Sequence, residues 1–363
     1  MALYYGADPA RMGDDANSDN AFPSGKTNEL FLKVFAGEVI TTFEENNAML
    51  PLTRVRTISS GKSAQFPTSG VATATYHTPG ESILATGLDT GGDAAIADAT
   101  KYLSKPNAAE RVIYIDDMLV SSVFLANIDE AKNHYDVRSI YSTEIGRALA
   151  YAADKNLIRC VINGALVGTD RFGGSDAQYL GAQIDHSGQA GSTAGDKMVD
   201  CMFEAAQLMD EANVPTTNRF AILRPADYYT LINLNKDAIN RDYGNEGNPS
   251  VANPGEVISV AGIRVLKSNH LPPRVNENAT PDALHGHAGI MNDTAGATTG
   301  YSGTNFADNK GCIFQTEGVG TVKLMDLAVE TDYSVERQGT LLVAKYAMGH
   351  GILRNECCFE IID

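Results

Sequence analysis

Residues 127–164 decide the fold, and they read NIDEAKNHYDVRSIYSTEIGRALAYAADKNLIRCVING. The stretch keeps one helical pattern throughout. Asn127 can cap the first turn together with Glu130, and Gly164 is expected to end the helix. From residue 128 to residue 163 such a helix is about 54 Å long, whereas an average globular helix has only about 11 or 12 residues. A rod of this length predicts an elongated subunit that other molecules cover, and it favours assembly over catalysis.

One side of the expected helix is apolar, and Glu144, Arg147, Asp154 and Lys155 are predicted to form a polar face. A coiled coil would need apolar positions at a spacing of 3.5 residues over at least three or four heptads. The spacing here is nearer 3.6, and Gly146 interrupts the pattern, which predicts a bend or a close contact. The apolar stripe comprises Ile145, Ala148, Leu149, Ala152, Ala153, Leu157, Cys160 and Val161.

Composition excludes several classes of protein. With 363 residues, 43% of them hydrophobic, the chain can bury a sizeable core. No apolar stretch is long enough to cross a membrane as a helix, and the polar first 20 residues do not resemble a secretory signal. The net charge is −17, whereas proteins that read nucleic-acid sequences carry a basic surface. Five cysteines without C-x-x-C spacing are expected to be reduced thiols.

The rest of the chain predicts an α+β core made from two separated segments. Persistent alternation over residues 319–362 indicates antiparallel strands, which are expected to pack on the long helix. Residues 166–316 then form an inserted α/β unit. Further elements are expected as helices at 30–43, 196–213 and 225–234, and as strands at 54–58, 71–76, 111–115 and 219–223. Residues 256–267 are expected to form a pair of strands broken at Ala261-Gly262.

Residues 54–116 form a separate feature because alanine and threonine dominate their alternating stretches. A two-stranded arm of this composition has little core of its own, and isolated hairpins are only marginally stable in water. We therefore expect this arm to lie on the surface of another subunit.

Candidate sites for ligands are incomplete. Gly61-Lys62-Ser63 matches the end of a phosphate loop, but Arg56 stands where the motif needs its first glycine. His285 and His287, with Asp282 nearby, lack the further ligands that structural zinc usually requires. We expect no cofactor and no metal, and a soluble metal- or nucleotide-dependent enzyme that uses Lys62, His285 or His287 is the alternative.

Two other histidines could be mistaken for catalytic bases. His134 stands beside Tyr135, and His350 lies between two glycines. Neither has a Gly-x-Ser-x-Gly elbow or a credible cysteine nucleophile to serve. The sequence therefore predicts no catalytic residue.

Five segments, in order along the chain, together resemble the major capsid protein family of short-tailed phages of the T-seven group. Each segment alone is a weak signal, but five in the same order are specific. They are LFLKVFAGE at 30–38, RTISSGKSAQFP at 56–67, NHYDVRS at 133–139, GTVKL at 320–324 and KYAMGHG at 345–351.

The resemblance implies a tailed-phage capsid fold of the Hong-Kong-ninety-seven type, in the α+β class. Its N-terminal tail and arm would be residues 1–53, and its extended hairpin loop residues 54–112. A peripheral domain would combine residues 113–165 and 317–363 around a spine helix at 128–163. The inserted axial domain would be residues 166–316. The acidic segment 330–336 departs from the family pattern, so no contacts are carried over there.

By the matching segments, nine residues are candidates for assembly motifs. Three would enter the extended loop, four would lie near the start of the spine helix, and two would fall on the returning strands. In that order they are Arg56, Lys62 and Phe66; His134, Tyr135, Asp136 and Arg138; and Lys345 and His350.

The resemblance also implies a function. The chain would be a structural protein of the virion that forms hexamers and pentamers of an icosahedral head around double-stranded DNA. Its implied partners are further copies of itself, a scaffolding protein, a portal and packaged DNA bound without sequence specificity. Assembly would take place in the cytoplasm of the bacterial host, away from any membrane.

Overall fold

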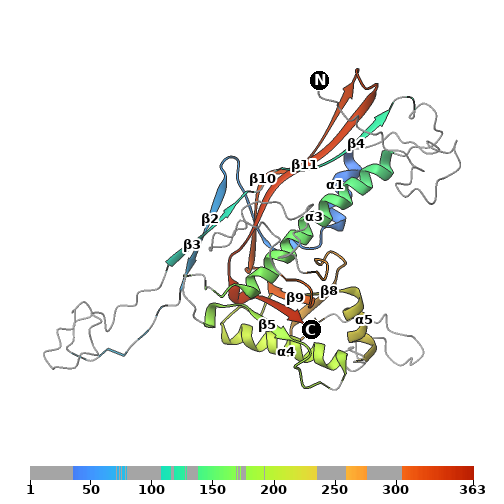
Figure 1. The fold of residues 1–363 in the computed structure, drawn as a ribbon. Coiled ribbons are helices and arrows are strands. Elements are labelled where there is room, and N and C mark those ends of the chain that lie inside the picture. Colours follow the sequence, from blue (N-terminus) through green and yellow to red (C-terminus); the bar gives the residue numbers. More distant parts are fainter. Residues whose placement is uncertain are drawn as a thin grey trace, which may run out of the picture.

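The structure is a computed structural model, and it describes eight segments of the chain together with single residues between them. The segments are 36–70, 108–115, 118–126, 138–168, 177–191, 193–234, 259–275 and 305–363, and the single residues are 72, 74, 76, 77, 79, 128, 170 and 172. A central body carries two long projections, one formed by the ends of strands β10 and β11 and the other by the hairpin β2–β3 (Figure 1).

The long helix is α3, Arg138–Leu166, which spans about 43 Å and lies between the two main sheets (Figure 1). Its predicted start cannot be compared, because residues 129–137 lie outside the described part. The predicted end is wrong, since Gly164 lies inside the helix. A Cβ atom at Gly164 would stand 3.0 Å from Sγ of Cys358. Because glycine has no side chain, the strand that begins at Cys358 can pack closely against the helix here. At Gly146 the predicted close contact is confirmed, because a Cβ atom there would stand 2.8 Å from the carbonyl oxygen of Val39.

The predicted faces of α3 are partly wrong. Ala148, expected in the apolar stripe, is exposed, whereas the other seven members of the stripe are buried. Asp154 and Lys155, expected on a polar face, are buried, as is Arg159 in the last turns. The guanidinium of Arg159 lies 6.0 Å from the ring centroid of Phe306. Partners distant in sequence surround the lower half of α3, so polar residues there face protein rather than water.

A four-stranded sheet packs against the upper half of α3 (Figure 1). Its order is β1 (Arg54–Thr57), β10 (Val319–Ser334), β11 (Gly339–Ile352) and β4 (Leu119–Ala126), with β1 parallel to β10 and the other pairs antiparallel. Leu125, Leu342 and Tyr346 face Leu149 of α3 in one buried cluster. The prediction that the C-terminal strands pack on the long helix is therefore confirmed.

Helix α1, Ala36–Asn46, covers the same face of this sheet beside α3. Val39 and Phe43, one helical turn apart, are both buried. The helix continues three residues beyond the predicted end at Phe43, and the predicted residues 30–35 lie outside the described part. A single 3-10 turn, η1 (Leu50–Leu52), then leads into β1.

The hairpin consists of β2 (Ser63–Ser69) and β3 (Ala108–Tyr114), which pair antiparallel as a separate two-stranded sheet. Its base rests on the four-stranded sheet, where Phe66 and Ile113 pack against Val322 and Leu353. Residues 71, 73 and 75 of the predicted strand 71–76 lie outside the described residues, and residues 72, 74 and 76 do not belong to a strand. The hairpin therefore has a small core at its base only.

The second main sheet has six strands and lies on the lower half of α3 (Figure 1). Its order is β5 (Ala182–Asp185), β12 (Cys358–Ile362), β9 (Asn309–Gln315), β6 (Arg219–Leu223), β8 (Ile263–Lys267) and β7 (Ser259–Val260). The last strand of the chain, β12, thus pairs within the sheet of the inserted unit, although residues 317–363 were expected in the other domain.

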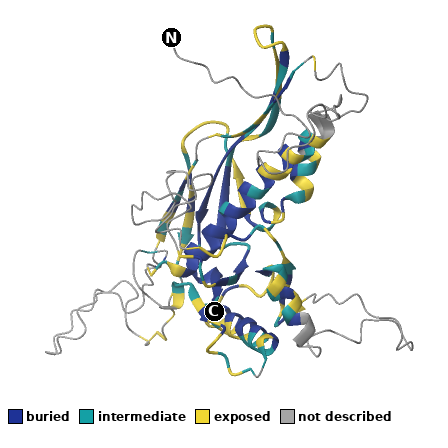
Figure 2. Cartoon of the chain, turned by 45° about the vertical axis from the view of Figure 1, so that its right-hand side comes forward, coloured by how far each residue is buried: buried dark blue, intermediate teal, exposed yellow. Residues whose placement is uncertain are grey.

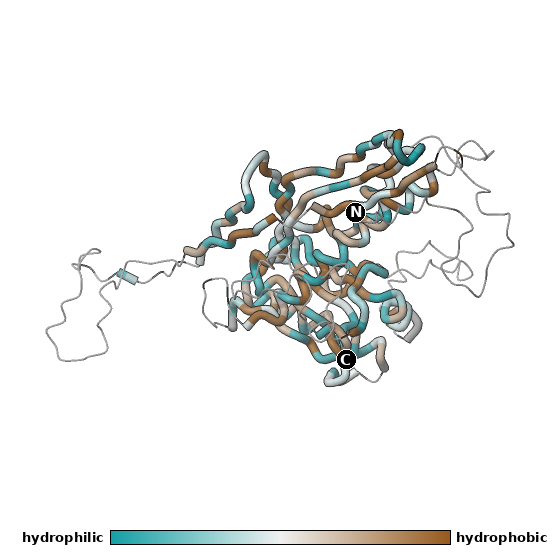
Figure 3. Tube along the Cα trace, turned by 45° about the horizontal axis from the view of Figure 1, so that its top comes forward, coloured by the Kyte–Doolittle hydropathy of each residue, from teal (hydrophilic) through white to brown (hydrophobic). Residues whose placement is uncertain are grey.

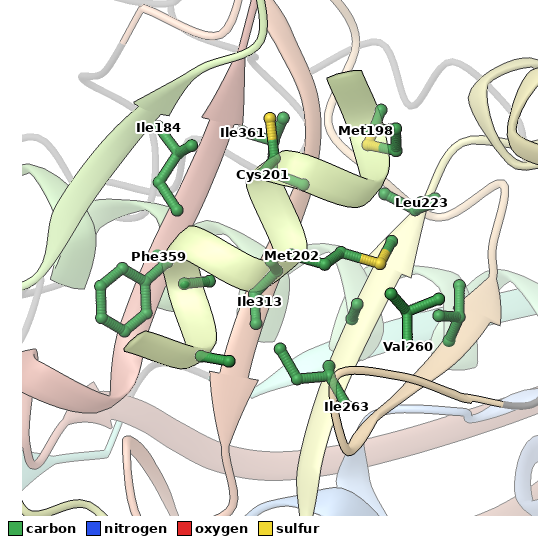
Figure 4. Packing of buried hydrophobic residues seen from close by; sticks show 14 of the residues in the cluster. Ile184, Met198, Cys201, Met202, Leu223, Val260, Ile263, Ile313, Phe359 and Ile361 are labelled. Atoms are coloured by element: carbon green, nitrogen blue, oxygen red, sulfur yellow. The ribbon is translucent and has the colours of Figure 1, made fainter. Parts of the chain in front are cut away.

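Helices α4 (Ala194–Glu211) and α5 (Pro225–Leu234) cover the other face of this six-stranded sheet. The side chain of Thr193 accepts a hydrogen bond from the N–H of Asp196, and Asp196 answers in a capping box that starts α4. Figure 4 shows Met198 and Met202 of α4 directed toward Leu223 and the strands beside it. All five cysteines are free and buried.

Candidate assembly interface

The outer end of β10 and β11 projects from the body and carries exposed apolar side chains. Tyr333 is 48% exposed and Val335 is 69% exposed, close to the turn that joins the two strands. Figure 2 shows this tip in the colour of exposed residues, and Figure 3 shows hydrophobic stretches along the same projecting strands. Large apolar side chains on a projection without a core of its own indicate a surface that contacts another molecule.

The four-stranded sheet also has an outer face, opposite α1 and α3. Pairing places Leu341 beside Phe124, and Lys345 beside Val120, on this face. Strand β3 crosses the face at Gly349, whereas the Val120 side chain further along the face is 47% exposed. This outer face is therefore a second candidate contact surface.

Lys345, a predicted assembly residue, lies on that outer face. Its Nζ atom stands 2.7 Å from Oε2 of Glu330 on the adjacent strand β10. The Glu330 side chain is 64% exposed, and ion pairs in such positions contribute only about 0.2–1 kcal/mol. Within one subunit, Lys345 thus links the two strands of the projection.

Arg56 and Phe66, also predicted assembly residues, meet at the base of the hairpin. Phe66 is buried, and the guanidinium groups of Arg54 and Arg56 lie 5.9 Å and 5.8 Å from its ring centroid. Arg56 also donates a hydrogen bond to the carbonyl of Gln65. Cations that close to an aromatic face are attracted by its quadrupole. The three side chains therefore tie β1 of the main sheet to β2 of the hairpin.

Lys62 is exposed in the turn between β1 and β2, where its carbonyl oxygen accepts a hydrogen bond of 2.9 Å from the N–H of Ile115. A phosphate loop requires a helix directly after it, but strand β2 follows here. The described residues contain no group of three or more histidine, cysteine or acidic side chains that could hold a metal. His285 and His287, which the enzyme alternative would use, lie outside those residues, as does the nearby Asp282.

The four candidates near the start of the long helix cannot be placed as a group. Arg138 begins α3, but its side chain is not among those described. His134, Tyr135 and Asp136 lie outside the described residues. Their part in assembly stays a prediction.

His350 lies inside the four-stranded sheet. It is 2% exposed, and its Nδ1 atom stands 3.0 Å from Oγ1 of Thr321, its pairing partner on β10. Burial lowers the pKa of His350 from its ordinary 6.5 to about 4, because the charged imidazolium loses its hydration. The side chain is therefore neutral at neutral pH and contributes to the sheet rather than to an exposed contact.

We expect His350 to make the isolated subunit sensitive to acid. The unfolded chain takes up this proton near pH 6.5 and the folded chain only near pH 4, so the stability present above pH 6.5 is lost as the pH falls toward 4. The loss from this group is on the order of 3 kcal/mol. A His350→Gln variant should lose less stability than the wild type over that interval in urea unfolding. Equal losses in the two proteins would contradict the assignment.

A groove of about 530 Å³ lies between α1 and β10. Strand β10 bends here because its pairing with β11 shifts register between Lys323 and Met325 and again before Ala328. No motif in the sequence indicated the groove. The groove is lined by Phe43, Glu44, Asn47, Leu50, Pro51, Val55, Lys323, Asp326 and Leu327.

Comparisons with known proteins agree on one family. The family model described as Gp10A-like major capsid protein matches residues 65–362. The chain is 31% identical over 342 residues to the major capsid protein of Escherichia phage T7, covering 92% of this chain and 91% of that protein. The same identity, over 347 residues, relates it to the major capsid protein of Enterobacteria phage T3, covering 92% of this chain and 91% of that protein.

Solved structures support the same assignment. The capsid structure of the cyanophage P-SCSP1u matches with a TM-score of 0.63 at 38% identity, covering 92% of this chain and 93% of that one. The mature capsid of bacteriophage PhiM1 matches with a TM-score of 0.64 over 100% of this chain and 98% of its own, but at 17% identity this likeness concerns the fold alone. The predicted tailed-phage capsid fold is confirmed, and the chain belongs to the Gp10A-like family of major capsid proteins.

Proposed function

We propose that copies of this major capsid protein join as hexamers and pentamers and close an icosahedral phage head around double-stranded DNA. The observation that carries the proposal is the apolar surface on the projecting end of β10 and β11, where Tyr333 and Val335 are exposed. Contacts of this kind, repeated around each subunit, sum to the large interfaces of permanent assemblies, which often exceed about 2,000 Å².

The same proposal assigns each part of the subunit to a domain of the tailed-phage capsid fold. Residues 1–53 act as the N-terminal arm, 54–112 as the extended loop, 113–165 and 317–363 as the peripheral domain, and 166–316 as the axial domain. The hairpin β2–β3 supports the assignment of the extended loop. It projects from the body, and only its base has a hydrophobic core. Strand β1 lies along β10, and β12 lies in the six-stranded sheet, so the first and last strands join neighbouring parts of the subunit.

The proposed partners are a scaffolding protein that guides curvature, a portal at one vertex and DNA bound without sequence specificity. The net charge of −17 supports the last point, because an acidic shell protein repels the phosphate backbone. Assembly is proposed to take place in the cytoplasm of the bacterial host. Within the described part of the chain, no helix has the length and apolar character needed to cross a membrane.

Replacing Val335 with aspartate should abolish assembly and leave the subunit folded. Val335 is 69% exposed, so the new charge is solvated in the free subunit, but an interface would have to bury it next to apolar surface. We expect shells from the wild-type chain expressed with a scaffolding protein, and only free subunits from Val335→Asp. Negative-stain microscopy measures the shells, and urea unfolding checks the subunit.

A Val335→Ile variant, which keeps the apolar surface, is the matched control and should assemble normally. Normal shells from Val335→Asp would show that the projecting tip makes no contact. Failure of the wild-type chain to form any closed particle would contradict the proposed function itself.

A further inference from the structure

The carboxylate of Asp154 joins three segments that are far apart in the sequence. Asp154 lies on α3 and is completely buried. Its Oδ2 and Oδ1 atoms accept hydrogen bonds of 3.0 Å from the N–H groups of Ala48 and Met49. The Nδ1 atom of His270 stands 2.7 Å from Oδ2. Because a carboxylate only accepts hydrogen bonds, this contact requires the proton on Nδ1.

Each segment belongs to a different part of the subunit. Ala48 and Met49 connect α1 to η1 and so to the four-stranded sheet. His270 follows β8, an inner strand of the six-stranded sheet, and the next residue, Leu271, is buried against the lower half of α3. The residues between α1 and η1, which include Ala48 and Met49, are called the arm connection below. The Asp154 carboxylate is thus a buried polar group at which the arm connection, the long helix and the six-stranded sheet meet.

Apolar packing alone would hold these parts together without fixing their angle. Leu157 and Ile158 of α3 pack on Ile222 and Phe314 of the six-stranded sheet, and such contacts are not directional. A buried carboxylate differs, because any arrangement that separates it from its donors leaves a charge unpaired in the interior. The arrangement with all three donors in place is therefore preferred over a rotated one.

The hydrogen bonds that Asp154 accepts from the arm connection and from His270 differ in how easily they break. The N–H groups of Ala48 and Met49 belong to backbone beside the buried Met49 side chain. The His270 side chain is 25% exposed. Its ring packs edge-on against the ring of Tyr151, with the two ring centroids 5.2 Å apart. The six-stranded sheet can therefore leave the carboxylate while the arm connection stays bound to it.

We propose that the bond from His270 to Asp154 sets the angle of the six-stranded sheet on the long helix and so makes the copies uniform enough to close shells of one size. The inference rests on the proposed function of the chain. His270 is a positioning residue in this role, since it acts through the orientation of the whole sheet rather than through a contact with a neighbouring copy.

A pair of variants tests the role of the Nδ1 donor. His270→Asn keeps a donor, because the amide nitrogen of asparagine takes about the place of Nδ1, whereas His270→Leu keeps apolar bulk and removes the donor. Amide hydrogen exchange of residues 268–271 in the free subunit should be about tenfold faster in His270→Leu and unchanged in His270→Asn. Exchange at Ala48 and Met49 should stay slow in both variants. Shells of His270→Leu should vary in diameter, and those of His270→Asn should match the wild type.

Three results would overturn the proposal. They are uniform shells from His270→Leu, variable shells from His270→Asn, and unchanged amide exchange at residues 268–271 in His270→Leu. If His270→Leu does not fold, His270→Ala removes the same donor and is measured in its place. If the wild-type chain forms no shells, the proposed function fails, and the exchange experiment on the free subunit still decides whether the bond holds the sheet.

Discussion

Replacing Gly349 with alanine is expected to lower the free energy of unfolding of the isolated subunit by about 3 kcal/mol or more. Gly349 lies on β11 where β3 crosses the four-stranded sheet. A Cβ atom there would overlap the carbonyl oxygen of Tyr114 and would stand 2.9 Å from Cα of Ile115. Both atoms belong to backbone, so the hairpin as a whole must move to make room. Urea unfolding of the unassembled protein, with a lower midpoint for the variant, measures the effect.

Gly168→Ala is the matched control for this experiment. No atom lies within 4 Å of a Cβ atom built at Gly168, and the residue is exposed beyond the end of α3. Where the backbone conformation suits alanine, such a change is nearly neutral or stabilises by about 0.4–1 kcal/mol. If Gly349→Ala unfolds at the same urea concentration as Gly168→Ala, the crossing of β3 over β11 is not as close as the structure places it.

Elements with strong local signals were predicted well. The strand Arg219–Leu223 and the helix Pro225–Leu234 have the predicted bounds, because a short apolar run and a proline in the first turn are local signals. The end of α3 was not predicted. The sequence shows that Gly164 lacks a side chain, but the strand that occupies the space, near Cys358, lies almost 200 residues further along the chain.

Burial of polar residues was the main feature that sequence patterns could not show. Asp154 and Lys155 stand between the apolar positions of an amphipathic helix pattern. Charged residues in such positions normally indicate the solvated face of the helix. The partners that bury Asp154 come from residues 48–49 and 270, more than 100 positions away in either direction. Long-range pairing also explains β12, whose alternation predicted a strand correctly but did not identify its sheet.

The candidate assembly residues show the same limit. The resemblance selected candidate residues from five segments, but it did not separate residues that hold the subunit together from residues that face a neighbour. Phe66 and His350 belong to the first group by burial. The exposed Tyr333 and Val335 were missed, although two large apolar residues within the acidic segment 330–336 were a signal that could have identified them.

Replacing Leu149 with aspartate is expected to remove most of the stability of the subunit, by about 4 kcal/mol or more. Leu149 is 2% exposed and lies in the cluster that joins α3 to α1 and the four-stranded sheet. The change deletes a large apolar side chain and buries a carboxylate, and the surrounding cluster consists of hydrophobic side chains. Soluble yield and the urea midpoint of the free subunit measure the loss.

Ala148→Asp is the matched control, because it places the same charge one position away on the same helix. Ala148 is exposed, so its carboxylate stays in water and the cost should remain within about 0.5 kcal/mol. The sequence pattern alone put Ala148 and Leu149 in one apolar stripe, so it predicts losses of the same kind for both. A large difference between the two variants confirms the orientation of α3, and equal unfolding midpoints would mean that the helix is rotated from the position described.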